Sequence, residues 1–437
     1  MTEAISLALL PRTAAIDSDG RMSIGGCDLA GLAQQFGTPL FVYDETEIRE
    51  RCREYVDTFR GSVAYASKAF LCQAMVHIVA EEGLDIDVAS GGELHVALAA
   101  GMPPQRIVLH GNNKSIAELR QAMTIGVKHI VVDSFDELDR IHELVTVDGL
   151  PVPSVLVRVN PGVDAHTHEY LATGAVDSKF GFALLDGVAL RAIERIVNEG
   201  SARLAGLHIH IGSQIVVRDG FTAAIDRMVA FIAQIERATG VTIDELNLGG
   251  GLGVRYTLDD AGIDIGNHAA MIQEDLGSAL AAVGARSAPL LATEPGRSIV
   301  ATAGVTLYSV GTIKTVPGGR TYVSVDGGMS DNLRPALYGS RYEAFVATRA
   351  ALERNLVATV AGKHCEQGDL LVRDASLPSD IAVNDVLCTP CTGAYGYSMA
   401  SNYNKLARPA VVFVANGQAR VVIRRETQDD LHRLDVG

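Results

Sequence analysis

The sequence predicts an α/β fold: a (β/α)8 barrel of the TIM type, followed by a C-terminal antiparallel β domain. Three observations lead to this prediction. Short apolar runs recur between residues 62 and 294, and each ends in glycine or polar residues. Amphipathic stretches of helical period separate them, and strands that alternate with helices form parallel sheets. After Arg297 the apolar runs continue without regular helical stretches between them, which favours antiparallel strands.

Eight apolar runs are the candidate barrel strands. Together they span about 235 residues, close to the roughly 250 residues of a typical (β/α)8 barrel. In chain order the runs are 62–67, 84–89, 107–110, 129–133, 154–160, 204–211, 245–249 and 289–294. We therefore predict a barrel domain over residues 38–297.

The remaining chain is predicted to form the β domain, residues 298–437, together with an N-terminal segment, residues 1–37, that packs with it. Asn416-Gly417 between two apolar runs indicates a two-residue hairpin turn. Residues 14–26 form a candidate extra hairpin with its turn at 17–20. The other candidate strands are 306–316, 321–325, 370–373, 385–389 and 410–425.

Composition excludes several classes of protein. The formal net charge of −15 over 437 residues argues against nucleic acid or an anionic membrane surface as a partner. Cys388 and Cys391 are spaced as C-T-P-C, but no second pair completes a zinc site. No run approaches the roughly 18 apolar residues of a membrane span, and the first ten residues lack the basic start of a signal peptide. We expect a cytoplasmic protein with reduced thiols.

The carboxyl ends of barrel strands form the active site of such folds, and a lysine follows the first run directly. An ammonium group at a strand end is partly desolvated, which lowers its pKa and suits Schiff-base formation. A lone lysine at a strand end more often simply reaches solvent, so Lys68 by itself leaves both interpretations open. The second, third and fifth runs end near Asp87, His110 and Arg158.

Two histidines lie on the sixth run. His208 and His210 are two residues apart and so share one face of a strand. The pair suits a metal ion, or else one packed histidine and one that stacks on an aromatic ring. The sequence leaves both alternatives open.

The last two runs end in groups that suit a phosphorylated pyridine. The seventh is followed by glycines at 249–251, and glycine lets backbone N–H groups close on an anion. The eighth ends in Glu294, and a buried carboxylate facing a pyridine nitrogen keeps that nitrogen protonated. For Glu294 alone, an ordinary ion pair is an equal alternative. Lysine, stacking histidine, glycine loop and carboxylate together favour pyridoxal 5'-phosphate as the cofactor.

At these residues the chain resembles the fold-type III pyridoxal-phosphate decarboxylases, and within them the diaminopimelate branch. The resemblance covers nearly the whole chain and is carried by these motifs: GTPLFVYDE at 37, YASKAF at 65, DVASGGEL at 87, HGNNKS at 110, RVNPGVDAHTHEYLATG at 158, KFGF at 179, HIGSQ at 210, GGGLG at 249, EPGRS at 294, SDNLRPALYG at 330, CEQGD at 365 and GAYGYSMASNYN at 393.

The resemblance implies a role for individual residues. Lys68 binds the cofactor covalently, His210 stacks on its ring, Glu294 meets its pyridine nitrogen and Cys365 supplies a proton after carbon dioxide leaves. The implied cofactor-binding set is Lys68, Asp87, His210, Ser213, Gly250, Gly251, Glu294, Gly296, Arg297 and Tyr395. The implied substrate-binding set is Arg297, Arg334, Tyr338, Glu366 and Tyr395. Cys365 and Glu366 would come from the other subunit of a homodimer, and no metal ion takes part.

The implied substrate-binding residues favour one substrate. Two arginines and a tyrosine suit a carboxylate at the distal end of an amino acid, and Glu366 suits an ammonium group there. Ornithine has no distal carboxylate. We therefore expect decarboxylation of meso-2,6-diaminopimelate to L-lysine, which completes lysine biosynthesis.

Three alternatives remain open from the sequence. One is a related decarboxylase of another amino acid, of the ornithine or arginine type. Another is a metal-dependent barrel hydrolase that uses His208 and His210, although carboxylate ligands for it are not evident. The third is a non-catalytic binding relative, against which the presence of Lys68, Glu294 and Cys365 argues.

Overall fold

A computed structural model describes residues 4–163, 178–262 and 264–437. The chain divides into two compact units. The β unit comprises residues 1–51, 254–262 and 297–437, and the barrel unit comprises residues 52–253 and 263–296. The motif that begins at Arg158 continues into residues 164–174, which lie outside the described residues. The domain boundaries predicted after residues 37 and 297 remain predictions.

The barrel unit is built on eight parallel strands, one in each of the eight predicted runs. Their order in the sheet is β13-β12-β11-β9-β8-β7-β6-β5. The sheet closes between its two ends, where Val63 bridges Thr293 and Ala64 N donates to Thr293 O at 2.9 Å. The strands are β5 (Ala64–Ala66), β6 (Asp85–Val88), β7 (Ile107–Leu109), β8 (His129–Val132), β9 (Ser154–Asn160), β11 (Arg203–His208), β12 (Glu245–Asn247) and β13 (Leu290–Ala292), with the short β10 (Phe182–Ala183) beside β9. The predicted barrel is confirmed.

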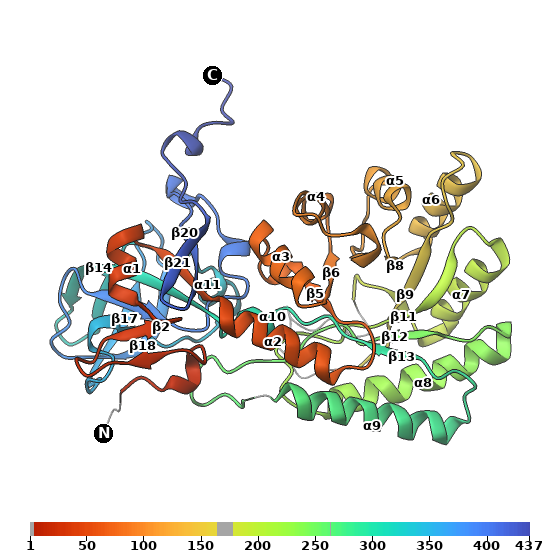
Figure 1. Ribbon diagram of the computed structural model, residues 1–437, viewed down its shortest axis with the longest axis horizontal. Coiled ribbons are helices and arrows are strands. Elements are labelled where there is room, and N and C mark those ends of the chain that lie inside the picture. The colour runs from red at the N-terminus through yellow and green to blue at the C-terminus, as the bar shows by residue number, and fades with distance from the viewer. Residues whose placement is uncertain (1–3, 164–177, 263) are drawn as a thin grey trace. The chain divides into compact units, whose positions relative to one another are not determined.

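Helices surround these strands in chain order (Figure 1). They are α3 (Gln73–Glu81), α4 (Gly91–Ala99), α5 (Ile116–Ile125), α6 (Phe135–Thr146), α7 (Val188–Glu199), α8 (Asp219–Thr239) and α9 (Ile265–Val283). Val108, Val131, Leu156 and Ala205, on the neighbouring strands β7, β8, β9 and β11, form a buried cluster. None of the helices within the described ranges combines the length and the apolar character that crossing a membrane requires.

Three consecutive strand-to-helix turns share one capping pattern. Ser90, Ser115 and Ser134 precede α4, α5 and α6, and each side chain accepts a hydrogen bond from the backbone N–H three residues later. A glutamate occupies that third position each time, as in the S-x-x-E capping box. Each glutamate also bonds a backbone N–H of its own turn: Glu93 that of Ala89, Glu118 that of Ser115, and Glu137 that of Asp133.

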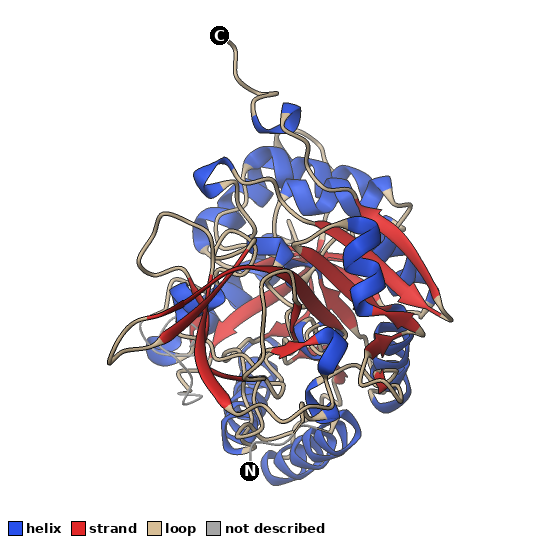
Figure 2. Ribbon diagram, turned by 90° about the vertical axis from the view of Figure 1, so that its left-hand side faces the viewer, coloured by secondary structure: helices blue, strands red, loops and turns tan. Residues whose placement is uncertain are grey.

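The β unit holds one mixed sheet, mostly antiparallel, whose strands are drawn in red in Figure 2. Its order is β18-β17-β15-β14-β4-β20-β21, with β19 beside β14 and β16 beside β19. The strands are β4 (Leu40–Asp44), β14 (Gly304–Thr315), β15 (Thr321–Val325), β16 (Phe345–Val346), β17 (Leu356–Ala361), β18 (Leu370–Leu377), β19 (Val386–Thr389), β20 (Ala410–Ala415) and β21 (Gln418–Ile423). Two pairs, β4 with β20 and β15 with β17, are parallel. The predicted β domain is confirmed, although the sequence analysis missed β4, β16 and β17.

Both predicted hairpins are present in the β unit. Strands β20 and β21 are joined at Asn416 and Gly417, which have φ angles of 53° and 74°, as a tight hairpin turn requires. The N-terminal strands β1 (Ala15–Ile16), β2 (Met22–Ile24) and β3 (Cys27–Asp28) form a small antiparallel sheet. Gly417 N donates to Gly25 O at 2.7 Å, so this small sheet packs on the hairpin. The helices of the segments that flank the barrel strands are α1 (Leu29–Phe36), α2 (Glu45–Thr58), α10 (Arg297–Val300) and α11 (Arg334–Tyr338).

Candidate active site

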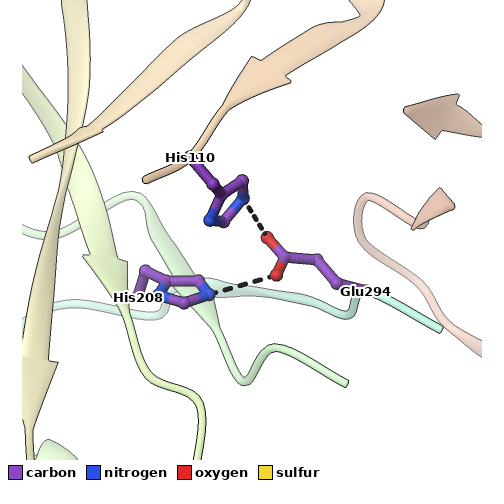
Figure 3. Close-up of side chains that lie close together, drawn as sticks. All are labelled: His110, His208 and Glu294. Atoms are coloured by element: carbon purple, nitrogen blue, oxygen red, sulfur yellow. Dashed lines mark hydrogen bonds and ion pairs between the residues drawn. The ribbon is translucent and has the colours of Figure 1, made fainter. Parts of the chain in front are cut away.

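A buried carboxylate lies at the carboxyl end of the last barrel strand. Glu294 follows β13 and is 6% exposed, with His110 and His208 directed at its two oxygens (Figure 3). Oε2 accepts a hydrogen bond from His208 Nε2 at 3.1 Å, and Oε1 accepts one from Asn247 Nδ2 at 2.8 Å. His110 Nε2 lies 3.0 Å from Oε1, within ion-pair distance but poorly aligned for a hydrogen bond. The ends of four strands, β7, β11, β12 and β13, therefore meet at one carboxylate.

Glu294 is held in its ionised form. Burial acts to raise the pKa of this carboxyl group, but the contacts with His110 and His208 outweigh burial and hold the pKa well below its usual range. Burial lowers the pKa of His208 to about 4 and also lowers the pKa of His110. The site therefore combines a carboxylate whose ionised form is favoured with two imidazoles whose protonation is disfavoured by burial.

His208 and His210 have different surroundings. His208 is 1% exposed, and its Nδ1 has no hydrogen-bond partner within the part of the chain that the structure describes. His210 follows the end of β11, and its Nδ1 accepts the N–H of Gly250 at 3.3 Å. His208 is therefore buried, with one ring nitrogen on the Glu294 carboxylate, and the predicted stacking role of His210 remains a prediction.

A metal ion shared by His208 and His210 is not supported. His208 instead groups with His110 and Glu294, whose ligand atoms lie within 4.8 Å of one another. A carboxylate does accompany the histidines, contrary to what the sequence suggested. This trio is the set in the described barrel that could hold a metal ion.

The glycine loop at residues 249–251 packs so closely that side chains do not fit. A Cβ at Gly249 would lie 2.6 Å from Ile209 O, one at Gly250 would lie 2.3 Å from Glu294 O, and one at Gly251 would lie 2.4 Å from Gly212 O. Gly249 and Gly251 also have positive φ angles of 65° and 109°, which glycine adopts readily. This loop therefore brings backbone, rather than side chains, to the barrel mouth, beside the segment that carries Ser213.

Lys68 and Asp87 lie at the ends of the first two strands. Lys68 follows β5 in a short 3-10 helix, Ser67–Ala69. Its side chain is exposed, so the partial desolvation expected from its position is not observed. Asp87 is buried, and burial followed by the charge of Glu294 raises its pKa well above the usual range, while the charge of Lys68 opposes this shift. The charge of Lys68 also contributes, after burial, to lowering the pKa of His210.

Gly296 lies against the first strand of the barrel. A Cβ at this position would lie 2.9 Å from the Cβ of Ala66 and 3.0 Å from its carbonyl oxygen. Ala66 N donates to Pro295 O at 2.9 Å. The segment from Glu294 to Gly296 is thereby fixed next to the strand that leads into Lys68.

The β unit contributes a cluster of two buried arginines and four tyrosines. Arg334 is 4% exposed and donates from Nε to Tyr342 Oη at 2.9 Å and from Nη2 to Ser340 Oγ at 3.1 Å. Arg297 is 5% exposed, donates to Tyr256 Oη and lies 4.8 Å above the Tyr395 ring. The Arg334 guanidinium lies 5.3 Å from the ring of Tyr256, 5.6 Å from Tyr338 and 5.8 Å from Tyr395.

Arg334 has no acidic counter-ion among the residues that the structure describes. Within the described residues its hydrogen bonds go to hydroxyl oxygens, and no carboxylate lies at ion-pair distance from it. A buried cation without a carboxylate partner is costly. The cluster therefore suits an anionic group of a ligand.

The loop that carries Cys365 and Glu366 is also in the β unit. Both side chains are exposed, whereas the other five cysteines are buried. The Cys365 N–H donates to Asn404 Oδ1 at 3.0 Å, and Tyr403 Oη lies 3.5 Å from Glu366 Oε2. Within one described chain, neither the Cys365 thiol nor the Glu366 carboxylate is covered.

The predicted site residues thus fall into two groups, one in each unit. Lys68, Asp87, His210, Ser213, the glycines and Glu294 belong to the barrel unit, and Arg297, Arg334, Tyr338, Tyr395, Cys365 and Glu366 belong to the β unit. Four contacting residues were not predicted from the sequence: Asn247, Tyr256, Ser340 and Tyr342. Asn247 could have been found, since it lies within the seventh apolar run, two residues before the glycines at 249–251.

Comparisons with known proteins show the family to which the chain belongs. Residues 45–301 match the family model described as pyridoxal-dependent decarboxylase, pyridoxal binding domain. The chain is 47% identical to diaminopimelate decarboxylase of Bacillus subtilis, covering 95% of both chains, and 46% identical to that of Mycobacterium tuberculosis, covering 100% of both. It also superposes on the crystal structure of the M. jannaschii diaminopimelate decarboxylase in complex with L-lysine, with a TM-score of 0.90, 34% identity and 98% of both chains covered.

Proposed function

Because this chain belongs to the pyridoxal-dependent decarboxylase family, we propose that it removes one carboxyl group from meso-2,6-diaminopimelate and releases L-lysine and carbon dioxide. Similarity to diaminopimelate decarboxylases along the whole chain supports this reaction. The observation that carries the choice of substrate is the pair of buried arginines in the β unit. The enzyme is a carboxy-lyase, and its product makes this the closing step of lysine biosynthesis.

The residues of the barrel unit fit pyridoxal 5'-phosphate. The glycine loop exposes backbone where any Cβ would collide with a neighbouring carbonyl, as an anion site built from N–H groups requires. We assign the phosphate to Ser213, Gly250, Gly251, Gly296 and the backbone of Arg297. Glu294 is a buried, ionised carboxylate, which suits a protonated pyridine nitrogen. Lys68 would hold the cofactor at its aldehyde group, and Asp87, His210 and Tyr395 would bind the rest of it.

The bound cofactor supplies an electron-withdrawing ring that makes loss of carbon dioxide from the attached amino acid possible. The chain's own residues do the rest. Glu294 keeps a proton on the ring nitrogen, because its ionised form prefers a cationic partner. Lys68 would hold the cofactor through its amino group when no substrate is bound. Cys365 supplies the proton to the carbon that has lost its carboxyl group, a role that typically contributes 10²–10⁴-fold.

The distal end of the substrate carries both a carboxylate and an ammonium group. Arg297, Arg334 and Tyr338 would bind the carboxylate, for which Arg334 has no protein substitute among the described residues. Glu366 would bind the ammonium group. Ornithine, which offers an ammonium group alone, would place a cation next to two arginines, so a preference for ornithine is the less supported alternative.

We also propose a homodimer in which Cys365 and Glu366 complete the site of the partner chain. Both side chains are exposed, which suits residues that act on a second chain. Mixing Lys68→Ala and Cys365→Ala variants tests this arrangement. Random exchange of subunits gives half mixed dimers with one intact site each, so activity should return to about a quarter of the wild-type value. If exchange is verified and no activity returns, both residues act within one chain.

The reaction itself is tested by carbon dioxide release from meso-2,6-diaminopimelate, ornithine, arginine and lysine by the purified holoenzyme. We expect the highest kcat/KM for meso-2,6-diaminopimelate and L-lysine as the product. A preference for ornithine or arginine would contradict the proposal. We further propose a cytoplasmic location, where a reduced Cys365 thiol is maintained.

A further inference from the structure

The two oxygens of Glu294 have different partners. Oε1 is approached by Asn247 Nδ2 at 2.8 Å and by His110 Nε2 at 3.0 Å. Oε2 has one protein donor among the described residues, His208 Nε2 at 3.1 Å. An ionised carboxylate offers about four acceptor positions. The protein groups therefore leave one acceptor position on Oε2 unused.

His208 can serve this carboxylate in only one tautomer. An ionised carboxylate accepts and does not donate, so the proton must be on Nε2. Nδ1 is then an acceptor, and it has no donor within the described part of the chain. Burying an imidazole nitrogen without a partner costs stability, so packing alone does not explain a histidine here.

Asn247 connects the carboxylate to the glycine loop. Its Nδ2 donates to Glu294 Oε1, and its Oδ1 accepts the Gly249 N–H at 2.8 Å. Glu294 N in turn donates to Gly249 O at 2.8 Å. One amide side chain thus fixes the distance between the group assigned to the ring nitrogen and the loop assigned to the phosphate.

We propose that His208 and Asn247 are positioning residues, which hold the Glu294 carboxylate so that Oε2 offers its unused acceptor position to the ring nitrogen of the cofactor. The inference rests on the proposed function, since it assumes that Glu294 meets that nitrogen. Neither residue is assigned to the substrate. Both act through Glu294. Its negative charge also reaches two other carboxyl groups, since the pKa values of Asp87 and Glu245 are raised by burial and, in addition, by the charge of Glu294.

The test compares the holoenzyme with His208→Leu, His208→Gln and Asn247→Leu. Leucine keeps the volume and removes the donor, whereas the glutamine amide retains an N–H near the Nε2 position. His129→Leu is the matched control, because His129 is also a buried barrel histidine, 8% exposed, but its Nδ1 contacts Ser154 Oγ at 2.9 Å. Two quantities are measured: steady-state kcat and KM, and the 15N chemical shift of ring-labelled cofactor bound without substrate.

We expect the leucine variants at 208 and 247 to lose about 10- to 100-fold in kcat, with KM within about threefold of wild type. Their ring 15N signal should move toward the unprotonated position. His208→Gln and His129→Leu should keep the wild-type 15N shift and stay within about threefold in kcat. If His208→Leu does not fold, Asn247→Leu and His208→Gln still give a decision.

Two results would overturn the inference. One is a wild-type ring 15N shift, with kcat within about threefold of wild type, in a folded leucine variant. The other is an equal loss in His208→Gln and His208→Leu, which would mean that the donor at Nε2 does not matter. Failure of the proposed reaction is seen separately, since wild-type protein would then bind the cofactor with a protonated ring but release no carbon dioxide from meso-2,6-diaminopimelate.

Discussion

Replacing Arg334 by methionine should reduce activity toward the proposed substrate selectively. Methionine keeps much of the length of the arginine stem and removes the guanidinium. Arg334 is 4% exposed, and its Nε and Nη2 bond only neutral hydroxyl groups in the described chain. Its full positive charge is therefore available to a substrate carboxylate.

The size of the effect follows from that geometry. A hydrogen bond to a charged partner contributes about 1.5–3 kcal/mol, which corresponds to a loss of roughly 10- to 150-fold in kcat/KM. The loss should be confined to meso-2,6-diaminopimelate, because lysine and ornithine have no distal carboxylate for Arg334 to bind. Any residual reaction with those two should be unchanged or slightly faster.

The assay is carbon dioxide release with each substrate, at matched cofactor occupancy. Arg354→Met is the control, because Arg354 is also buried, at 8% exposure, but pairs with Glu343 at 3.2 Å. That variant should lose stability without changing the ratio of kcat/KM between substrates. Equal losses of Arg334→Met for all substrates would show that Arg334 supports the fold and does not select the substrate.

Three further predictions concern the cofactor and stability. Lys68→Ala should fold but lose the covalent cofactor, and borohydride reduction of wild-type protein followed by mass spectrometry should place the adduct on Lys68 and nowhere else. Gly250→Ala should lower cofactor affinity by at least about tenfold, measured by absorbance titration, because its Cβ would lie 2.3 Å from Glu294 O; unchanged affinity would contradict the close packing. His129 and His268 have pKa values lowered by burial to about 4, so their stabilisation is complete above pH 6.5 and is lost as pH falls toward 4. Between pH 6.5 and 5, each of these two histidines should lower the free energy of unfolding by about 2 kcal/mol. His129→Gln should therefore flatten the pH dependence of Tm. An unchanged slope would argue against a neutral buried His129.

The barrel was predictable because each of its strands is indicated by a short segment of the sequence alone. Each strand is a short buried run, and the residue after each run, such as Lys68, His110 or Glu294, lies at the catalytic face by the topology of the fold alone. Strand β4 was missed for the opposite reason. Its five residues are all buried and precede a helix, so the sequence pattern resembles a barrel strand, and its pairing with β14 and β20 depends on segments several hundred residues away.

The site residues likewise include some that could be predicted from the sequence and some that could not. Position at a strand end and residue type suggested roles for Lys68 and Glu294 but left other interpretations open, and the resemblance to the decarboxylase family implied the specific roles. The partners of Arg334 could not be predicted, because Tyr256 and Tyr342 come from separate segments without regular spacing, and only the folded β unit brings them to one guanidinium. The exposure of Lys68 was likewise not predictable, since it depends on what surrounds the end of β5.

The serine–glutamate caps at α4, α5 and α6 affect where an anion can bind at the carboxyl ends of the barrel strands. A helix N-terminus normally attracts anions. Here Glu93, Glu118 and Glu137 already occupy backbone N–H groups of three successive turns, so each of those termini carries its own anion. The loop at residues 249–253 contains no acidic residue. The turns before α4, α5 and α6 thus have backbone N–H groups already bonded to carboxylates, whereas the glycine loop carries no acidic side chain of its own, which makes that loop the better candidate for an anion.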